Sequence, residues 1–199
     1  MNVEPVVLEG QEVRLEPLAL GHWEDLCAIG LAPDLWKLIP THVQNATDMR
    51  TYIETALREQ AAGMSLPFAT ISKSAGRAIG STRFMNIERK HLRVEIGSTW
   101  IGGEWQRTRV NTEAKYLMLR HAFEIWKCNR VELKTDSLNQ RSRRAIQRIG
   151  AKEEGIFRNH MVVQEGRLRH TVYFSIIHSE WPAVKESLEE KLGTGPAAR

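Results

Sequence analysis

The chain has 199 residues, of which 42% are hydrophobic and 26% are charged, and its formal net charge is +4. This composition is typical of one soluble globular domain. No apolar run reaches the ~20 residues that cross a bilayer, and the N-terminus lacks a signal-peptide pattern, so we expect a cytoplasmic protein without membrane contact. Two cysteines, Cys27 and Cys128, are too few for a disulfide framework or a metal centre, and we expect two reduced thiols and no metal.

The first half of the chain is predicted to contain helices near its start and then a meander of strands. Residues 12–18 read as a strand and residues 21–30 as a short helix. A second helix begins after Thr47 and Asp48 and ends at Gly63. Turn signals then separate the next predicted strands, which cover residues 67–72, 78–87 and 92–101.

The second half is dominated by an apolar helix over residues 111–127. Its polar residues form one narrow stripe, made of Glu113, Arg120, Glu124 and Lys127, so this helix should be packed on most sides. The later predicted elements are a strand over 130–135, a helix over 140–149 capped by Asn139 and ended by Gly150, strands over 155–163 and 170–177, and an amphipathic helix from about Ser179.

This order of elements predicts an α/β fold of the α+β type. A meander followed by strand–helix–strand units implies a mixed sheet with helices on both faces. We expect a single domain over residues 1–192 and a flexible tail over residues 193–199. The connection from the strand ending near residue 101 into the next helix points backbone N–H groups and the positive end of a helix dipole outward, so it is a candidate phosphate-binding turn.

Several short motifs follow one another in a fixed order: Glu95-Ile96-Gly97, Trp105-Gln106, Asn111-Thr112-Glu113-Ala114, Asn139-x-x-Ser142 and Arg148-Ile149-Gly150-Ala151. In these motifs the chain resembles the GNAT superfamily of acyl-CoA-dependent N-acetyltransferases from about residue 10 to 190. It is most similar to the branch that contains bacterial ribosomal-protein N-terminal acetyltransferases. The resemblance implies the GNAT fold, a mixed and mostly antiparallel sheet of about seven strands flanked by helices, with acetyl-CoA as co-substrate.

The resemblance also implies where acetyl-CoA binds. The pantetheine arm would lie along Thr99, Trp100 and Ile101. The pyrophosphate would lie on the loop made of Gln106, Arg107, Thr108, Arg109, Val110, Asn111 and Thr112. The loop departs from the family pattern, because Arg109 replaces its first glycine and Asn111 its last small residue. If the first position requires a positive φ, Arg109 costs about 1–2 kcal/mol. The guanidinium groups of Arg107 and Arg109 could instead bind phosphate directly.

Asn139 and Ser142 form a second candidate constellation. Ser142 shares a helical face with Ala145, Ile146 and Ile149, so it should point inward. The resemblance implies that Ser142 protonates the departing CoA thiolate and that Asn139 contacts pantetheine. The alternative is a serine that makes local backbone bonds.

The arginines of the same helix have several readings. One interpretation is that Arg143, Arg144 and Arg148 form a solvated basic face. The other is that they bind a ligand: the 3′-phosphate of CoA, for which Arg144 is the candidate, ribosomal RNA or an acidic protein. Charge alone does not choose among these ligands.

The general base has two candidates. Glu95 lies on the fourth strand and shares a face with Arg93, so a structural ion pair is the alternative; His160 is either a base or a core histidine. Met161 stands where the ribosomal-protein enzymes carry a suspected glutamate. Trp36 and His170 are expected to line the acceptor side.

The predicted function is direct transfer of acetyl from acetyl-CoA to a primary amine, either a small molecule or a protein N-terminus. The alternative is a catalytically degenerate acyl-CoA-binding, protein-binding or RNA-binding module, which the arginines of the loop suggest. Ribosome association and a homodimer are compatible with both readings.

Overall fold

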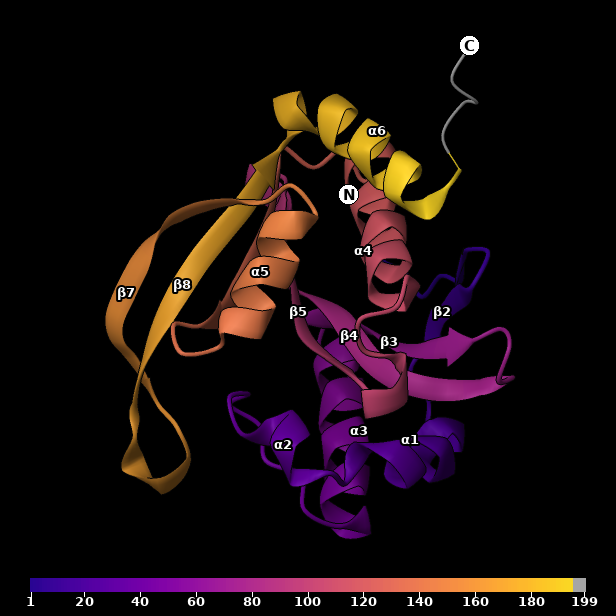
Figure 1. Ribbon diagram of the computed structural model, residues 1–199, viewed down its shortest axis with the longest axis vertical. Coiled ribbons are helices and arrows are strands. Elements are labelled where there is room, and N and C mark those ends of the chain that lie inside the picture. The colour runs from indigo at the N-terminus through magenta and orange to yellow at the C-terminus, as the bar shows by residue number, and fades with distance from the viewer. Residues whose placement is uncertain (195–199) are drawn as a thin grey trace.

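In the computed structural model, which describes residues 1–194, one mixed sheet runs through the molecule (Figure 1). Within these residues the sheet has 8 strands in the order β1-β2-β3-β4-β5-β6-β8-β7, and its parallel pair is β5–β6. The strands are β1 (Leu8–Glu9), β2 (Val13–Pro17), β3 (Ser65–Ser72), β4 (Arg77–Glu88), β5 (Arg93–Ile101), β6 (Arg130–Asp136), β7 (Lys152–Val162) and β8 (Leu168–Ile177). The predicted mixed, mostly antiparallel sheet is confirmed, and the short β1, which pairs with β2, adds a strand to the expected number.

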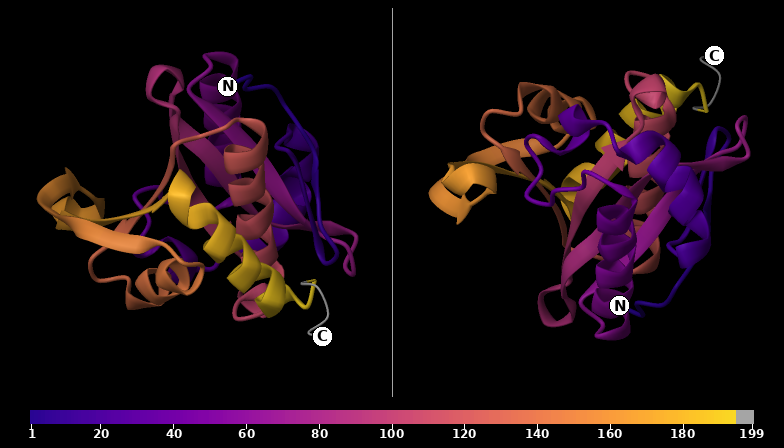
Figure 2. Two further views of the ribbon diagram at one scale, coloured as in Figure 1. Left: turned by 90° about the horizontal axis from the view of Figure 1, so that it is seen from above. Right: turned by 90° about the horizontal axis from the view of Figure 1, so that it is seen from below.

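Helices cover both faces of the sheet, as Figure 2 shows. They are α1 (Trp23–Gly30), α2 (Pro33–Trp36), α3 (Ala46–Ala61), α4 (Val110–Arg120), α5 (Gln140–Arg148) and α6 (Trp181–Leu192). Strand alternation divides the core: on β3, Phe68 belongs to the cluster under α4 and α6, whereas Ala69 belongs to the cluster under α1 and α3. None of the helices in residues 1–194 is long and apolar enough to cross a bilayer.

Some predicted boundaries moved because local signals compete. The side chain of Asn45 accepts from the Asp48 N–H, so α3 begins at Ala46, before the expected start that follows Thr47 and Asp48. The long predicted helix is α4, which begins at Val110 and continues as a π-helical turn over His121–Ile125. Asn139 caps α5 as predicted, and Gly150, at φ +93°, follows its end.

The polar stripe predicted on α4 is wrong at Glu113, which is buried. Its carboxylate accepts the backbone N–H groups of Gln11, Glu12 and Val13 at 2.7, 2.8 and 2.7 Å. These donors compensate the buried charge and hold the turn before β2 against α4.

The C-terminal boundary differs in part from the expected tail. Gly193 ends α6 at φ +68°, and the Thr194 N–H donates to Glu189 O at 2.9 Å, so both residues belong to the helix cap. The rest of the expected tail, residues 195–199, lies outside the described residues.

Candidate functional site

The two parallel strands separate and open a cleft. Pairing between β5 and β6 covers Arg93–Glu95 and Arg130–Glu132. Beyond it, β5 continues beside β4 to Ile101, while β6 continues beside β8 to Asp136. A cleft of about 1520 Å³ lies there, lined by β5, the loop before α4, the start of α5, and the segment from α2 into α3. Splayed strands leave backbone groups of β5 free to pair with an extended ligand.

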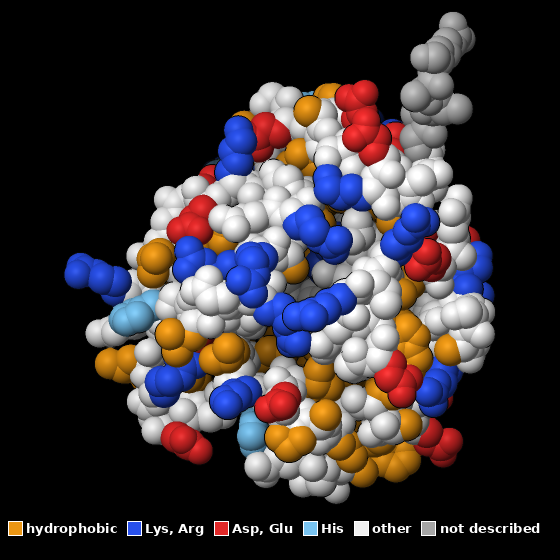
Figure 3. All heavy atoms as spheres, viewed as in Figure 1, with side chains coloured by type: hydrophobic (Ala, Val, Ile, Leu, Met, Phe, Trp, Pro, Cys, Tyr) orange, Lys and Arg blue, Asp and Glu red, His pale blue; other side chains and the backbone are white. Residues whose placement is uncertain are grey.

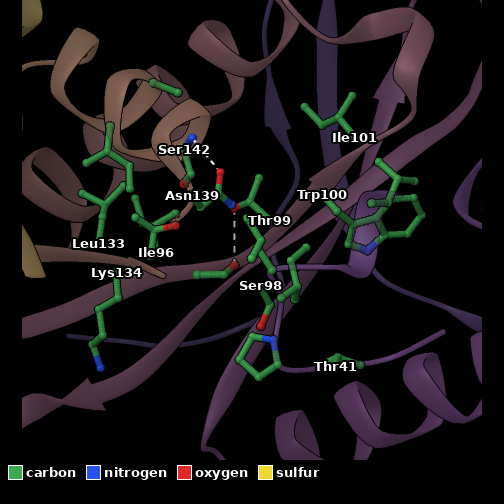
Figure 4. Close-up of a pocket in the computed structure, with 18 of the residues that line it drawn as sticks. Thr41, Ile96, Ser98, Thr99, Trp100, Ile101, Leu133, Lys134, Asn139 and Ser142 are labelled. Atoms are coloured by element: carbon green, nitrogen blue, oxygen red, sulfur yellow. Dashed lines mark hydrogen bonds between the residues drawn. The ribbon is translucent and has the colours of Figure 1, made fainter. Parts of the chain in front are cut away.

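The predicted pantetheine segment lies along this cleft. Thr99, Trp100 and Ile101 all line it (Figure 4). Ser98, with φ +46°, bends β5 near the point where its pairing with β4 shifts register. Such a bulge turns neighbouring groups of the strand toward a site.

The loop before α4, the predicted phosphate site, has a backbone conformation that differs from the expected one. Arg109, with φ −69°, has helical geometry, so the left-handed cost expected there is absent; Arg107, with φ +64°, adopts that conformation instead. Arg107 lines the cleft. Arg109 turns away, and its guanidinium donates to Leu192 O at 3.4 Å at the C-terminus of α6, where a helix dipole favours a cation.

The other predicted loop residues divide between the cleft and the core. Gln106, Thr108 and Asn111 line the cleft. Val110 and Thr112 are buried and are not among the lining residues; the Thr112 hydroxyl accepts from the Arg148 guanidinium at 2.7 Å. These two residues therefore support the loop from behind.

Gln106 joins the loop to its surroundings. Its Nε2 donates to Ile101 O at 2.9 Å, and its Oε1 accepts from the Arg141 guanidinium at 2.6 Å. The loop is thereby tied to the end of β5 and to α5.

Asn139 and Ser142 meet at the first turn of α5 and face β5 across the cleft (Figure 4). Asn139 Oδ1 accepts the Ser142 backbone N–H at 3.0 Å. Within the described residues the Ser142 hydroxyl has no hydrogen-bond partner, so it is available to a ligand, and the alternative of a locally bonded serine side chain finds no support.

Basic side chains line the part of the cleft next to α5 and the loop before α4. Figure 3 shows lysine and arginine side chains around the hollow of this face, where Arg107, Arg141, Arg144 and Arg148 are lining residues. Arg143 instead pairs with Glu153 at 3.0 Å. The arginines of α5 therefore divide between the cleft and the surface, and do not form one solvated face.

Glu95 is buried, at 6% exposure, and is bound on two sides. Its carboxylate pairs with Lys134 Nζ at 2.7 Å and accepts from Asn86 Nδ2 at 2.6 Å. Burial lowers the pKa of Lys134, but the hydrogen bond and charge of Glu95 outweigh this and raise it above its ordinary value. The predicted alternative to a general base at Glu95 is a structural ion pair, with Arg93 on the same face. The ion pair is present, but it is formed with Lys134, whereas Arg93 pairs with Glu132.

Trp36 does not line the cleft, contrary to expectation. It is 1% exposed, its Nε1 donates to Gly30 O at 2.6 Å, and its ring packs against Trp100 and Tyr52. Trp36 is a core residue beneath the acceptor side, because its position on the short α2 turns it into the cluster of α1 and α3.

The two histidines lie on the β7–β8 hairpin. His160 is exposed, lines the cleft with Met161, and packs edge-on to Phe157 and Tyr173, so it is not a core histidine. His170 does not line the cleft: its Nδ1 accepts the Asn159 N–H at 2.9 Å, and it borders a separate hollow that it shares with His160.

Lys115 is a cleft residue that the sequence analysis missed. It is 5% exposed on α4, and its Nζ donates to Thr82 Oγ1 at 3.0 Å and Thr99 Oγ1 at 2.6 Å. Burial lowers the pKa of its ammonium to about 7. The sequence did contain a signal for this residue: Lys115 is a lysine among the apolar residues of the predicted helix and lies outside its polar stripe.

The residues of the cleft fit a CoA molecule. The buried Oδ1 of Asn111, in the first turn of α4, has no hydrogen-bond partner within residues 1–194, which favours a ligand that supplies one. Arg107, Arg144 and Arg148 supply planar donors that suit phosphate. Among the described residues, no group of three His, Cys, Asp or Glu side chains could hold a metal ion.

Comparison with known proteins agrees with this geometry. Residues 12–152 match the family model described as an acetyltransferase (GNAT) domain. The chain is 30% identical over 145 residues to the Bacillus subtilis protein named "Putative ribosomal N-acetyltransferase YdaF", covering 71% of this chain and 78% of that one.

Solved structures are similar over nearly the whole length. A GCN5-related N-acetyltransferase from Brucella melitensis is 33% identical with a TM-score of 0.86, covering 94% of this chain and 86% of that one. Mycobacterium smegmatis RimJ in complex with CoA-disulfide is 21% identical with a TM-score of 0.77, covering 94% and 92%, a likeness that shows the fold.

Proposed function

The chain belongs to the GNAT acetyltransferase family, N-acetyltransferases that depend on acetyl-CoA, and we propose that it acetylates a protein N-terminal amine by direct transfer. The observation that carries this proposal is the size of the cleft and its division into two halves. At about 1520 Å³ it exceeds the ~300–1,000 Å³ of ordinary small-molecule sites, which leaves room for a coenzyme and an extended acceptor together.

The two halves of the cleft differ in charge. Arginines line the proposed coenzyme half, whereas the opposite wall, from α2 into α3, has mixed charge, with Asp34 and Asp48 beside Lys37. The basic half attracts a polyphosphate, and the carboxylates of Asp34 and Asp48 give a cationic amine two acidic groups on the opposite wall. The relative named as a ribosomal N-acetyltransferase supports a ribosomal protein as the acceptor.

The cleft residues supply binding, orientation and proton transfer. Arg107, Arg144, Arg148 and the loop before α4 would hold the coenzyme phosphates, with Thr99, Trp100, Ile101 and Asn139 along the pantetheine arm. Acetyl-CoA supplies its acetyl group as a thioester, whose carbon–sulfur bond is exchanged for a bond to the amine nitrogen. Holding both reactants in one cleft provides much of the rate.

Two residues would move protons in this reaction. His160 accepts the proton released by the amine, because Glu95 is already bound to Lys134 and Asn86. The Ser142 hydroxyl, free of partners within the described residues, gives a proton to the departing sulfur.

A thiol-release assay with N-terminal peptides and small amines tests the proposal. We expect peptides to be acetylated with a higher kcat/KM than free amino acids or polyamines. Ser142→Ala should lower kcat by about 100-fold, the contribution typical of a general acid, with a smaller change in the KM for acetyl-CoA. Ser179→Ala, on the turn before α6, is the control and should leave both constants unchanged.

Two results would contradict the proposal. Tight acetyl-CoA binding without thiol release from any amine would favour the degenerate binding module. Release with small amines alone would exclude the protein acceptor.

A further inference from the structure

Lys115 is a buried cation without a carboxylate partner among the described residues. Its ammonium is bonded to two hydroxyls, Thr82 Oγ1 on β4 and Thr99 Oγ1 on β5, which lie 2.7 Å from each other. Thr99 and Lys115 line the cleft, and Thr82 does not. The three side chains form a polar cluster where β5 has separated from β6.

The ammonium makes both hydroxyls of this cluster hydrogen-bond acceptors. A protonated lysine has three donors and no acceptor, so both hydroxyls must accept from it. The Thr82 proton then has two acceptors within reach, Thr99 Oγ1 at 2.7 Å and Met118 Sδ at 3.7 Å, and the oxygen is the stronger acceptor at the shorter distance. With Thr82 donating to Thr99, the Thr99 oxygen is fully used as an acceptor and its own proton is free. The nearest other acceptor for that proton is Gly97 O, at the long distance of 3.5 Å. The Thr99 proton is therefore available to a ligand in the cleft.

We infer that Lys115 is a positioning residue of acetyl transfer: its ammonium orients the Thr99 hydroxyl so that the proton is presented to the acyl oxygen of a bound thioester. This inference rests on the proposed function. A fixed donor at the place where negative charge develops stabilises the transition state, because the dipole needs no reorganisation during the reaction. When Lys115 loses its proton, Nζ becomes an acceptor, Thr99 donates to it, and the cleft loses that donor.

The surroundings place the titration of Lys115 in an accessible range. Burial lowers the pKa of Lys115 to about 7. Charged groups of the neighbouring elements have other partners: Arg83 on β4 with Glu59 on α3, Glu95 on β5 with Lys134 on β6, Glu113 on α4 with the backbone before β2, and Arg148 on α5 with Thr112. Other charged or titratable groups of this region are Arg107 in the loop, Arg144 on α5, Tyr116 on α4, and Arg120 and His121 further along the same helical segment, and none of them is bonded to Lys115 within residues 1–194.

Matched variants separate this role from a structural one. Lys115→Met and Thr99→Val should lower kcat by about 100-fold, as loss of one such donor does, with little change in the KM for acetyl-CoA. Thr99→Ser keeps the hydroxyl and should retain most of the rate. Lys185→Met, at a lysine on α6 that pairs with Glu124, is the control.

The pH profile gives a second measurement on the same variants. In the parent protein kcat/KM for acetyl-CoA should fall as pH rises through the titration of Lys115, and this limb should be absent from Lys115→Met and Thr99→Val. Parental kcat in Lys115→Met, or a limb that persists in it, would overturn the inference.

Calorimetry of CoA binding tests Lys115 without any acceptor. Titration at pH 8 in buffers of different ionisation enthalpy measures the protons taken up, and the parent should take up more than Lys115→Met because anionic CoA favours the ammonium. Lys185→Met should match the parent. Equal uptake by parent and Lys115→Met would overturn the inference even if peptides are acetylated. The expected difference in uptake with no turnover of any amine would instead contradict the proposed function.

Discussion

At the scale of single residues, Lys115 shows how burial changes the chemistry of a side chain. Its ammonium exchanges water for two hydroxyl oxygens, which do not replace full hydration or a counter-charge. The pKa therefore falls from 10.5 to about 7. At low pH the folded protein contains this charged lysine in a buried position, which lowers its free energy of unfolding.

The resulting prediction concerns stability and pH. Between about pH 7 and 10.5 the unfolded chain holds the Lys115 proton and the folded protein does not, so the free energy of unfolding rises with pH across this interval. Lys115→Met removes the cost, and we expect it to be more stable than the parent at pH 6, with a smaller difference at pH 9. Urea denaturation at both pH values measures this.

Lys185→Met should behave in the opposite sense. The hydrogen bond from Lys185 to Glu124 raises the pKa of this lysine, so its contribution is present at pH 6 and pH 9 and is lost only above the ordinary value. The variant should be slightly less stable than the parent at both pH values. A loss of stability in Lys115→Met that is equal at pH 6 and pH 9 would contradict the account of Lys115.

At the scale of elements, Glu113 connects α4 to the first strands. The three N–H groups that it accepts belong to the turn before β2 and to the first residue of β2, about a hundred residues away along the chain. Gly10 is needed beside it, because a Cβ there would lie 2.5 Å from the Glu113 carboxyl carbon. Since the proposed phosphate-binding loop leads directly into α4, this contact also holds the loop in place.

We expect Glu113→Gln to lower the free energy of unfolding by about 2 kcal/mol or more. The amide keeps one oxygen and presents an NH2 group to backbone donors, so at least one charge-assisted bond is lost. Glu190→Gln, on the exposed side of α6, should stay within about 0.5 kcal/mol of the parent. Equal denaturation midpoints for the two variants would show that the contact contributes no stability.

At the scale of the whole molecule, the β7–β8 hairpin contacts the N-terminal helical segment at the edge of the cleft. Gln164, at the turn of the hairpin, donates from Nε2 to Ile39 O at 2.8 Å, with Pro40 O at 3.2 Å. Residues 39–42 line the cleft. The contact therefore joins two distant parts of the chain at the part of the cleft where we propose that the acceptor binds.

Gln164→Ala should loosen this contact. A lost hydrogen bond of about 1 kcal/mol corresponds to roughly a fivefold rise in the KM for a peptide acceptor, while the KM for acetyl-CoA stays unchanged. Hydrogen exchange in residues 39–43 should become faster. Gln147→Ala, on the exposed side of α5, is the control. A rise confined to the KM for acetyl-CoA would contradict this role.

The sequence by itself determined the order of the longer elements and identified many of the residues that line the cleft, while it missed the short β1 and α2. The capping of α5 by Asn139 and the alternation along the strands depend on residues within a turn or two, which periodicity and capping rules describe. The motifs from Glu95 to Ala151 indicated the family, and most of their residues reach the cleft.

Tertiary structure alone decided which side chains the cleft contains. Lys115 depends on Thr99 and Thr82, 16 and 33 residues away along the chain, Arg109 is drawn to the end of α6, and Trp36 is covered by α3 and β5. Burial and ion pairing are set by such long-range neighbours, so the direction of a side chain and the state of its proton follow from packing and not from local pattern.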